Sequence, residues 1–341
     1  MKCQSDKIRF VTQAQLIGCL LVVLGHSIPL SWNVPSIIYN IDVFIYTFHM
    51  PLFFFISGYL FEKTASYSRY DFRAYVLKRN NRLMIPYFAM TLIGFIPKII
   101  MNRFFEDDSS LNILYFIKCF LVPRDNVWGH FWFLPTLFII SMLSFVFSKI
   151  KHLNGNVYCA FSVLLLCLSI IPNLVNITEW FAVNDIIRFV GYYAVGIMFA
   201  NTKFELLLSN NNSCYKLLLL FAISIGLFLI SINNKIFLQS IRTIIALLMI
   251  MVILAFSSLV NFTSNKIGLH LSRKTYSIFI LSWPFQSIVS VVFEKVLGLK
   301  YYITMPLSFI SGVLGPVIVI FLVDLLEKKI GKRIISPIIG G

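Results

Sequence analysis

Two histidines lie within the first two long apolar stretches of the chain. His26 follows LIGCLLVVLG, and His49 lies inside FIYTFHMPLFFFISGYLF. An ionisable side chain at membrane depth is costly and rare, so it is by default a candidate for function. Two imidazoles could supply a base, an acid or a hydrogen-bond donor to a reacting hydroxyl or carbonyl group. A structural role stays open, in which each histidine binds a backbone carbonyl or a water between helices.

The spacing within the first stretch predicts how these side chains are arranged. Gln15 precedes His26 by 11 residues. At about 100° per residue, a helix places both side chains on one face, about 16 Å apart along the axis. A short loop joins the first two stretches, which favours antiparallel neighbours with His26 and His49 at similar depth.

A basic segment and an aromatic segment carry further candidates. KRNNRLMIP at 78–86 contains Arg79 and Arg82, and guanidinium groups bind phosphate through two parallel hydrogen bonds. HFWFLP at 130–135 places His130 and Trp132 at the predicted outer interface. The alternatives are ordinary positive flanking of a membrane helix for the first segment and an aromatic belt for the second.

One charged residue lies inside a later apolar stretch. Arg188 is part of DIIRFVGYYAVG and follows Asp185 by three residues. Residues at this spacing are neighbours on a helix, and a charge at membrane depth needs a partner. We therefore expect an internal ion pair between Arg188 and Asp185 near the outer boundary.

Composition assigns the chain to membrane proteins. Of its 341 residues, 58% are hydrophobic and 13% are charged, whereas soluble domains have about 25% charged residues. The net charge of +15 would suggest nucleic-acid binding in a soluble protein. Here the basic residues cluster in short loops, as the positive-inside rule describes, so no nucleic-acid partner is expected. The six cysteines have no metal-ligand spacing, and no metal is expected.

Ten apolar stretches are long enough to cross the hydrocarbon layer, which needs about 18 residues or more. Only helices are compatible with lipid at these lengths. The prediction is therefore an all-α integral membrane protein, a bundle of about ten transmembrane helices in a single domain over residues 1–341. Both termini are expected in the cytoplasm, because most Lys and Arg residues fall in alternate loops. The stretches cover residues 11–30, 39–61, 83–101, 130–148, 156–175, 180–200, 215–232, 236–260, 275–297 and 302–326.

Taken together, the motifs resemble acyltransferase family 3, a family of integral membrane acyltransferases. The resemblance spans almost the whole chain, and FHMPLFFFISGYLF is its most specific segment. It implies transfer of an acyl group, most often acetyl, from cytoplasmic acyl-coenzyme A to hydroxyl groups of cell-surface carbohydrates. The matching segments are LLVVLGHS at 20–27, FHMPLFFFISGYLF at 48–61, KRNNRLMIPYF at 78–88, HFWFLPTLF at 130–138, YYAVGIMF at 192–199 and TYSIFILSWPFQ at 275–286.

The resemblance also implies roles for individual residues. It maps the family's first-helix histidine onto His26, as general base or acyl carrier, and the basic motif onto Arg79 and Arg82, as partners of the coenzyme phosphates. The chain departs from the family at two positions. Gln15 stands where the family often has Arg or Lys, and Ser282 stands where it often has histidine.

The first functional hypothesis is an O-acetyltransferase in the bacterial cytoplasmic membrane. Its donor is acetyl-CoA, and its acceptor is a surface polysaccharide or a lipid-linked oligosaccharide. The expected catalytic residues are His26 and His49, the expected donor-binding residues are Gln15, Arg79 and Arg82, and the expected acceptor-binding residues are His130 and Trp132. Association into a homo-oligomer is left open.

The second hypothesis is a transporter or flippase for a lipid-linked glycan or a small metabolite. Ten helices with buried polar groups would suit such a protein. A transporter fold typically contains related halves, and the sequence has no visible internal repeat. Protection of the protein by acetyl-CoA would distinguish the two hypotheses.

Overall fold

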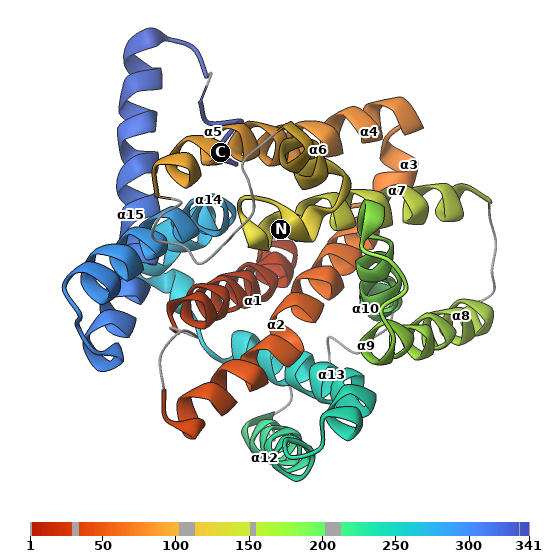
Figure 1. Cartoon of the computed structure of the whole chain (residues 1–341). Helices are drawn as coiled ribbons and strands as arrows, with labels where there is room; N and C mark the ends of the chain where they lie inside the picture. Colours follow the sequence, from red (N-terminus) through yellow and green to blue (C-terminus); the bar gives the residue numbers. More distant parts are fainter. Residues whose placement is uncertain are drawn as a thin grey trace.

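The computed structural model of the chain is a bundle of helices (Figure 1). It describes residues 2–28, 34–101, 113–150, 155–201, 213–333 and 335–340. These residues include no strand, which confirms the predicted all-α class. The principal helices are α1 (Lys2–Ser27), α2 (Ser36–Lys63), α4 (Phe72–Arg79), α5 (Ile85–Met101), α6 (Ile113–Leu121), α7 (Phe133–Ile150), α8 (Gly155–Leu168), α10 (Val183–Asn201), α12 (Ser213–Ser231), α13 (Lys235–Leu259), α14 (Lys266–Val289) and α15 (Tyr301–Ile330). Two single-turn helices, α3 (Ser66–Arg69) and α9 (Ile171–Leu174), lie in the connections.

Each of the ten predicted stretches overlaps a helix. The fifth stretch, 156–175, is interrupted, because α8 ends at Leu168 and the short α9 contains Pro172. The number of membrane crossings and the cytoplasmic location of the termini stay predictions. Seven helical segments among the described residues are long and apolar enough to cross a membrane: Arg9–Ser27, Ser36–Lys63, Gly129–Lys149, Trp180–Asn201, Lys235–Ser264, Lys266–Val296 and Tyr301–Ile330.

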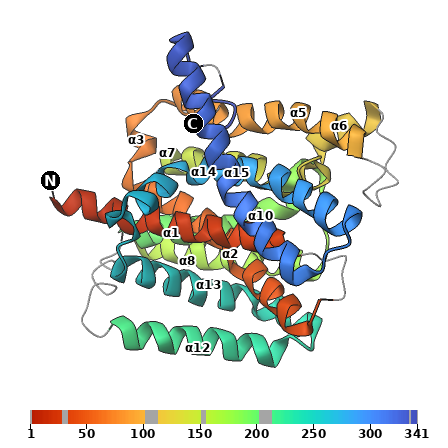
Figure 2. The same ribbon diagram turned by 90° about the vertical axis from the view of Figure 1, so that its left-hand side faces the viewer.

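Helix α2 lies at the centre of the bundle. It contacts α1, α10 and α13, and these helices surround it in Figure 1. The peripheral α12 packs against α13, and in Figure 2 the two run side by side at the lower edge. On the other side of α1, α14 packs against both α1 and α15. The histidine-bearing helices α1 and α2 are therefore enclosed by other helices.

The contact between α2 and α10 depends on two glycines. A Cβ atom at Gly58 would overlap the carbonyl oxygen of Tyr193, and one at Gly196 would overlap the carbonyl oxygen of Phe55. Small residues at membrane helix contacts let two backbones approach closely and gain van der Waals contact. Gly58 and Gly196 therefore set the distance between the helix that carries His49 and its neighbour α10.

Replacing Gly196 by valine is expected to destabilise the protein strongly. Overpacking a well-packed contact costs about 1–3 kcal/mol, and here the added atoms meet backbone that no rotamer change can move. The thermal unfolding temperature and the yield of folded protein in detergent should both fall. Gly226→Val is the matched control, because a Cβ at Gly226 in α12 has no heavy atom within 4 Å. Equal stability of the two variants would contradict this account of the α2–α10 contact.

The basic segment that follows α2 is also helical. After the short helix α3, Asp71 begins α4 by accepting a hydrogen bond from the amide of Ala74 at 2.8 Å, as N-terminal capping residues do. A π-helical turn, Asn80–Met84, then joins α4 to α5. This geometry places Arg79 at the end of α4 and Arg82 within the turn.

Candidate functional site

Two cavities inside the bundle contain the candidate residues. The first has a volume of about 340 Å³, is lined by His26, His49 and His130, and is called the histidine cavity. The second has a volume of about 310 Å³, is lined by Arg79 and Arg82, and is called the basic cavity. Cavities of this size are at the lower end of the range for small-molecule sites.

The structure sorts all seven residues proposed from the sequence into these two cavities. His26, His49, His130 and Trp132 line the histidine cavity. Gln15, Arg79 and Arg82 line the basic cavity. The proposed catalytic and acceptor residues are thus together, and the proposed donor residues are together in the other cavity. Their roles stay predictions.

Tyr46 joins the histidines of the first cavity. Its hydroxyl lies 3.3 Å from Nδ1 of His26, and its ring centroid lies 4.8 Å from that of His49 in an edge-on contact. The ring of His130 lies 5.7 Å from that of His26. Gly25 makes this approach feasible, because a Cβ there would lie 2.9 Å from the Tyr46 ring. As predicted, the first two helices bring His26 and His49 to one place.

His49 has a defined tautomer in this arrangement. Its Nδ1 lies 2.8 Å from the carbonyl oxygen of Ile45, and a carbonyl oxygen can only accept a hydrogen bond. Nδ1 therefore carries the proton, and in the neutral ring Nε2 carries the lone pair. Such a nitrogen can act as a base toward a hydroxyl group within reach.

His130 and Trp132 are buried, with 6% and 9% of their surfaces exposed. Both side chains contribute to the interior of the bundle, and their predicted position at the outer membrane interface stays a prediction. They lie in a 3₁₀ turn, Gly129–Trp132, directly before α7. Both ring nitrogens of His130 are buried and lack a hydrogen-bond partner among the residues that the structure describes.

The last turn of α1 is attached to α14 by Gln286. Its side-chain amide donates to the carbonyl oxygen of Val23 at 2.7 Å and to the hydroxyl of Ser27 at 2.8 Å. These two residues flank His26 in the sequence. Gln286 is 3% exposed, so the bonds form in a water-poor interior, and we infer that they fix the position of His26.

Gln286→Leu is expected to lower the kcat of a reaction that depends on His26 by about tenfold, because two hydrogen bonds of about 1 kcal/mol each no longer hold the turn that carries His26. The KM for a substrate of the basic cavity should stay unchanged, because Gln286 is not part of that cavity. Steady-state kinetics of the purified variant would test this. An unchanged kcat, with normal folding, would mean that the contact does not position His26.

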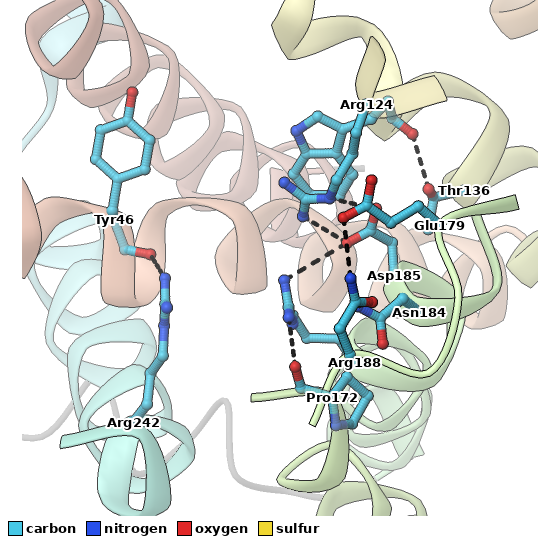
Figure 3. A network of polar contacts seen from close by, with 11 residues as sticks. Tyr46, Arg124, Thr136, Pro172, Glu179, Asn184, Asp185, Arg188 and Arg242 are labelled. Carbon is cyan, nitrogen blue, oxygen red and sulfur yellow. Dashed lines mark hydrogen bonds and ion pairs between the residues drawn. The ribbon is translucent and has the colours of Figure 1, made fainter. Parts of the chain in front are cut away.

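An ion-pair network borders the histidine cavity (Figure 3). Arg124 binds both carboxylate oxygens of Asp185, with Nε–Oδ2 and Nη2–Oδ1 distances of 2.8 and 2.5 Å. The Arg124 guanidinium also lies over the Trp132 ring, 4.4 Å from its centroid. The predicted pair between Arg188 and Asp185 is confirmed at 3.7 Å, although Arg124 is the closer partner.

The sequence interpretation missed Tyr46, Arg124 and Arg242 as cavity residues. Arg242 lies within α13 and lines the histidine cavity. Its Nη2 donates a hydrogen bond to the backbone carbonyl of Tyr46. The available signal was its position inside the predicted stretch 236–260, since a charge within a membrane helix is itself a candidate for function.

The basic cavity has its cations held in place by tyrosines. Nε of Arg79 donates to the hydroxyl of Tyr75 at 3.1 Å. The Arg82 guanidinium lies 5.5 Å from the centroid of the Tyr276 ring. Gln15 reaches this cavity from α1 and adds an amide that can form hydrogen bonds but carries no charge. A cavity with fixed guanidinium groups suits a ligand that carries phosphates.

Phe279 of α14 lines both cavities. Its ring contacts those of Phe53 and Phe133, with centroid distances of 6.5 and 5.6 Å, and that of His130 at 5.3 Å. The shared wall is therefore aromatic and apolar. A flexible chain entering from the basic cavity would have to pass these rings to reach His26.

Among the residues that the structure describes, no three His, Cys, Asp or Glu side chains are placed to bind one metal ion. What the arrangement offers instead is a base with a free lone pair, hydrogen-bond donors for a developing negative charge, and a separate cation-lined cavity. This combination suits group transfer between two substrates that bind from different sides.

Comparison with known proteins identifies the class. The family model described as "Acyltransferase domain" matches residues 8–325, nearly the whole chain. The chain belongs to this family, acyltransferase family 3, and is thus a multi-pass membrane acyltransferase. Neither the curated proteins nor the solved structures that were compared give a match.

Proposed function

We propose that this acyltransferase moves an acetyl group from acetyl-CoA, bound in the basic cavity, to a hydroxyl group of a surface polysaccharide or a lipid-linked oligosaccharide in the histidine cavity. The membrane is the bacterial cytoplasmic membrane. Arg79 and Arg82 bind the phosphates of the coenzyme, and Gln15 contacts the donor from α1. The acyl thioester extends past Phe279 toward His26.

The reaction needs one base and one leaving group. The imidazole of His26 accepts the proton of the acceptor hydroxyl as its oxygen attacks the thioester carbonyl carbon. The carbon–sulfur bond then breaks, and the thiolate takes the proton from the imidazolium to leave as free coenzyme A. In the carrier variant of the mechanism, the His26 nitrogen attacks the thioester carbonyl carbon, and the carbon–sulfur bond breaks to release the coenzyme A thiolate. The acceptor oxygen then attacks the acetyl-imidazolium, the carbon–nitrogen bond breaks, and the hydroxyl proton passes through the imidazole to the thiolate. His49 assists in either variant through its free Nε2.

One observation carries the proposal: Phe279 separates two arginine-lined cavities, and only one of them contains histidines. The phosphates of the donor and its neutral thioester carbonyl need different binding environments. Charged guanidinium groups suit the phosphates, whereas a water-poor cavity with a free base suits the acyl transfer itself. The two cavities provide these environments on opposite sides of one side chain.

Phe279→Ala is expected to increase hydrolysis of acetyl-CoA in the absence of any acceptor. Removing the ring opens the wall between the cavities, so that water reaches the thioester beside His26. Release of free thiol by the purified protein would measure this. Phe256→Ala, at a partly exposed position of α13, is the control. Unchanged hydrolysis with intact folding would argue against the path past Phe279.

Ligand protection tests the proposed donor directly. Acetyl-CoA should raise the thermal unfolding temperature of the purified full-length protein, because a ligand at about one hundred times its Kd stabilises the folded state by about 2.7 kcal/mol. Dephospho-CoA, which lacks one phosphate, should protect less at equal concentration. A transporter or flippase of a glycan would not respond to either compound. Absence of protection at millimolar acetyl-CoA would contradict the proposed donor.

A further inference from the structure

Three arginines line the histidine cavity: Arg124 from the 3₁₀ turn Pro123–Asp125, Arg188 from α10 and Arg242 from α13. None of them belongs to the basic cavity that is proposed for the donor phosphates. A charged side chain among membrane helices is unfavourable unless it is paired or bound to a ligand. Three such side chains from three separate segments therefore require an explanation.

Among the described residues, one carboxylate, that of Asp185, forms ion pairs with these arginines. Of the described residues that line the histidine cavity, none is Asp or Glu. Asp185, which is 2% exposed, lies behind the cavity wall and serves both Arg124 and Arg188. Arg242 forms no ion pair with any residue that the structure describes, and its observed acceptor is the neutral carbonyl of Tyr46. The cavity wall therefore has an excess of positive charge.

Arg188 has one donor that no described residue pairs. Nε of Arg188 is buried and has no hydrogen-bond partner among the described residues, while Nη2 of the same side chain donates to the carbonyl of Pro172 at 2.7 Å. In Figure 3, Arg242 lies against the backbone carbonyl of Tyr46, and Arg188 lies beside Asp185 and Pro172. Both arginines line the cavity that contains His26 and His49.

We propose that the acceptor carries an anionic group, a phosphate or a carboxylate, and that Arg242 and Arg188 bind it in the histidine cavity. This inference rests on the proposed function and adds the chemical class of its acceptor. Guanidinium groups match the planar carboxylate and the phosphate through paired hydrogen bonds. With its anion held there, the acceptor presents a neighbouring hydroxyl group to His26 and His49. A cavity of about 340 Å³ holds about one sugar ring with its charged substituent.

Three model acceptors test the proposal with the full-length protein in lipid nanodiscs: methyl glucoside, methyl glucuronide and glucose phosphate. The first is neutral, the second carries a carboxylate and the third a phosphate, so the two charged compounds also distinguish the sources of the anion. At least one charged sugar should raise the thermal unfolding temperature, and the neutral sugar should not. The kcat/KM for acetyl transfer to that charged sugar should exceed the value for the neutral sugar by about ten- to a hundredfold, the effect of charge-assisted hydrogen bonds.

Variants then assign the preference to Arg242. Arg242→Gln should abolish the preference, so that the charged and the neutral acceptor have the same kcat/KM. Arg242→Lys should retain part of the preference, because it keeps the charge but loses the guanidinium geometry. Lys235→Gln is the matched control: it removes one positive charge from an exposed position at the start of the same helix and should keep the full preference.

Two results would overturn the proposal. The first is equal stabilisation and equal transfer with neutral and charged sugars in the wild-type protein, which needs no variant and no assumption about folding. The second is an equal loss of kcat on all acceptors in Arg242→Gln, which would assign Arg242 to the reacting carbonyl instead. The thermal unfolding temperature of the same samples with acetyl-CoA tests the donor proposal separately from the proposal of an anion site. Donor protection without anion preference would refute the anion site alone, and anion stabilisation without donor protection would refute the acetyl-CoA proposal alone.

Discussion

His26→Ala is expected to reduce acyl transfer by about a hundred- to ten-thousandfold, the usual contribution of a positioned general acid or base. His26 lies in the histidine cavity, contacts the Tyr46 hydroxyl and has His130 as a neighbour. The KM for acetyl-CoA should change little, because the phosphates bind in the other cavity. Initial rates with purified protein, together with the thermal unfolding temperature, measure both effects.

His270→Ala provides the matched control for this prediction. His270 is an exposed histidine on α14 and belongs to neither cavity, so its removal should leave the rate unchanged. A parallel His49→Ala variant shows how far the second imidazole shares the role. If His26→Ala folds normally and retains the wild-type rate, His26 is not a catalytic residue.

The double variant Arg79→Gln, Arg82→Gln is expected to raise the KM for acetyl-CoA by about ten- to a hundredfold, because it removes charge-assisted hydrogen bonds to the coenzyme phosphates. Both side chains line the basic cavity, and Tyr75 and Tyr276 hold the two guanidinium groups. The kcat at saturating donor should fall much less, since the histidine cavity is intact. Titration of initial rates with acetyl-CoA separates the two parameters.

Arg69→Gln, Arg73→Gln is the control for charge alone. These arginines lie in the same basic segment, are exposed and are not part of the cavity. Their loss removes two positive charges from the region without removing a proposed phosphate contact. An equal rise in KM in both double variants would mean that general attraction to the basic segment, and not binding by Arg79 and Arg82, governs donor affinity.

The fold class follows from hydropathy, because long apolar stretches in lipid can only be helical. Each predicted stretch is a helix or overlaps one, and the spacing of Gln15 and His26 placed both on cavity-lining positions of α1. Hydropathy did not predict the break between Leu168 and Ile171 or the 3₁₀ turn before α7. Such interruptions depend on local backbone geometry, which an apolar window does not detect.

The candidate site could be predicted in part. His26, His49, Arg79 and Arg82 stand out by residue type and position, and the family resemblance supports them. Arg242 joins the histidine cavity only because α13 packs against α2, and no sequence pattern reports that contact. The division into two cavities is also a property of the assembled bundle, since Phe279 is indistinguishable in sequence from many other apolar residues of the chain.

Analysis of the surface glycans of a strain that lacks the gene tests the central claim most directly. The account predicts that mass spectrometry finds the glycan without its acetyl ester, that the wild-type gene restores the ester, and that the His26→Ala gene does not. An unchanged ester content in the deletion strain would contradict acyl transfer to a surface glycan. Loss of the glycan itself, with the remaining chains still acetylated, would instead identify a transporter or flippase.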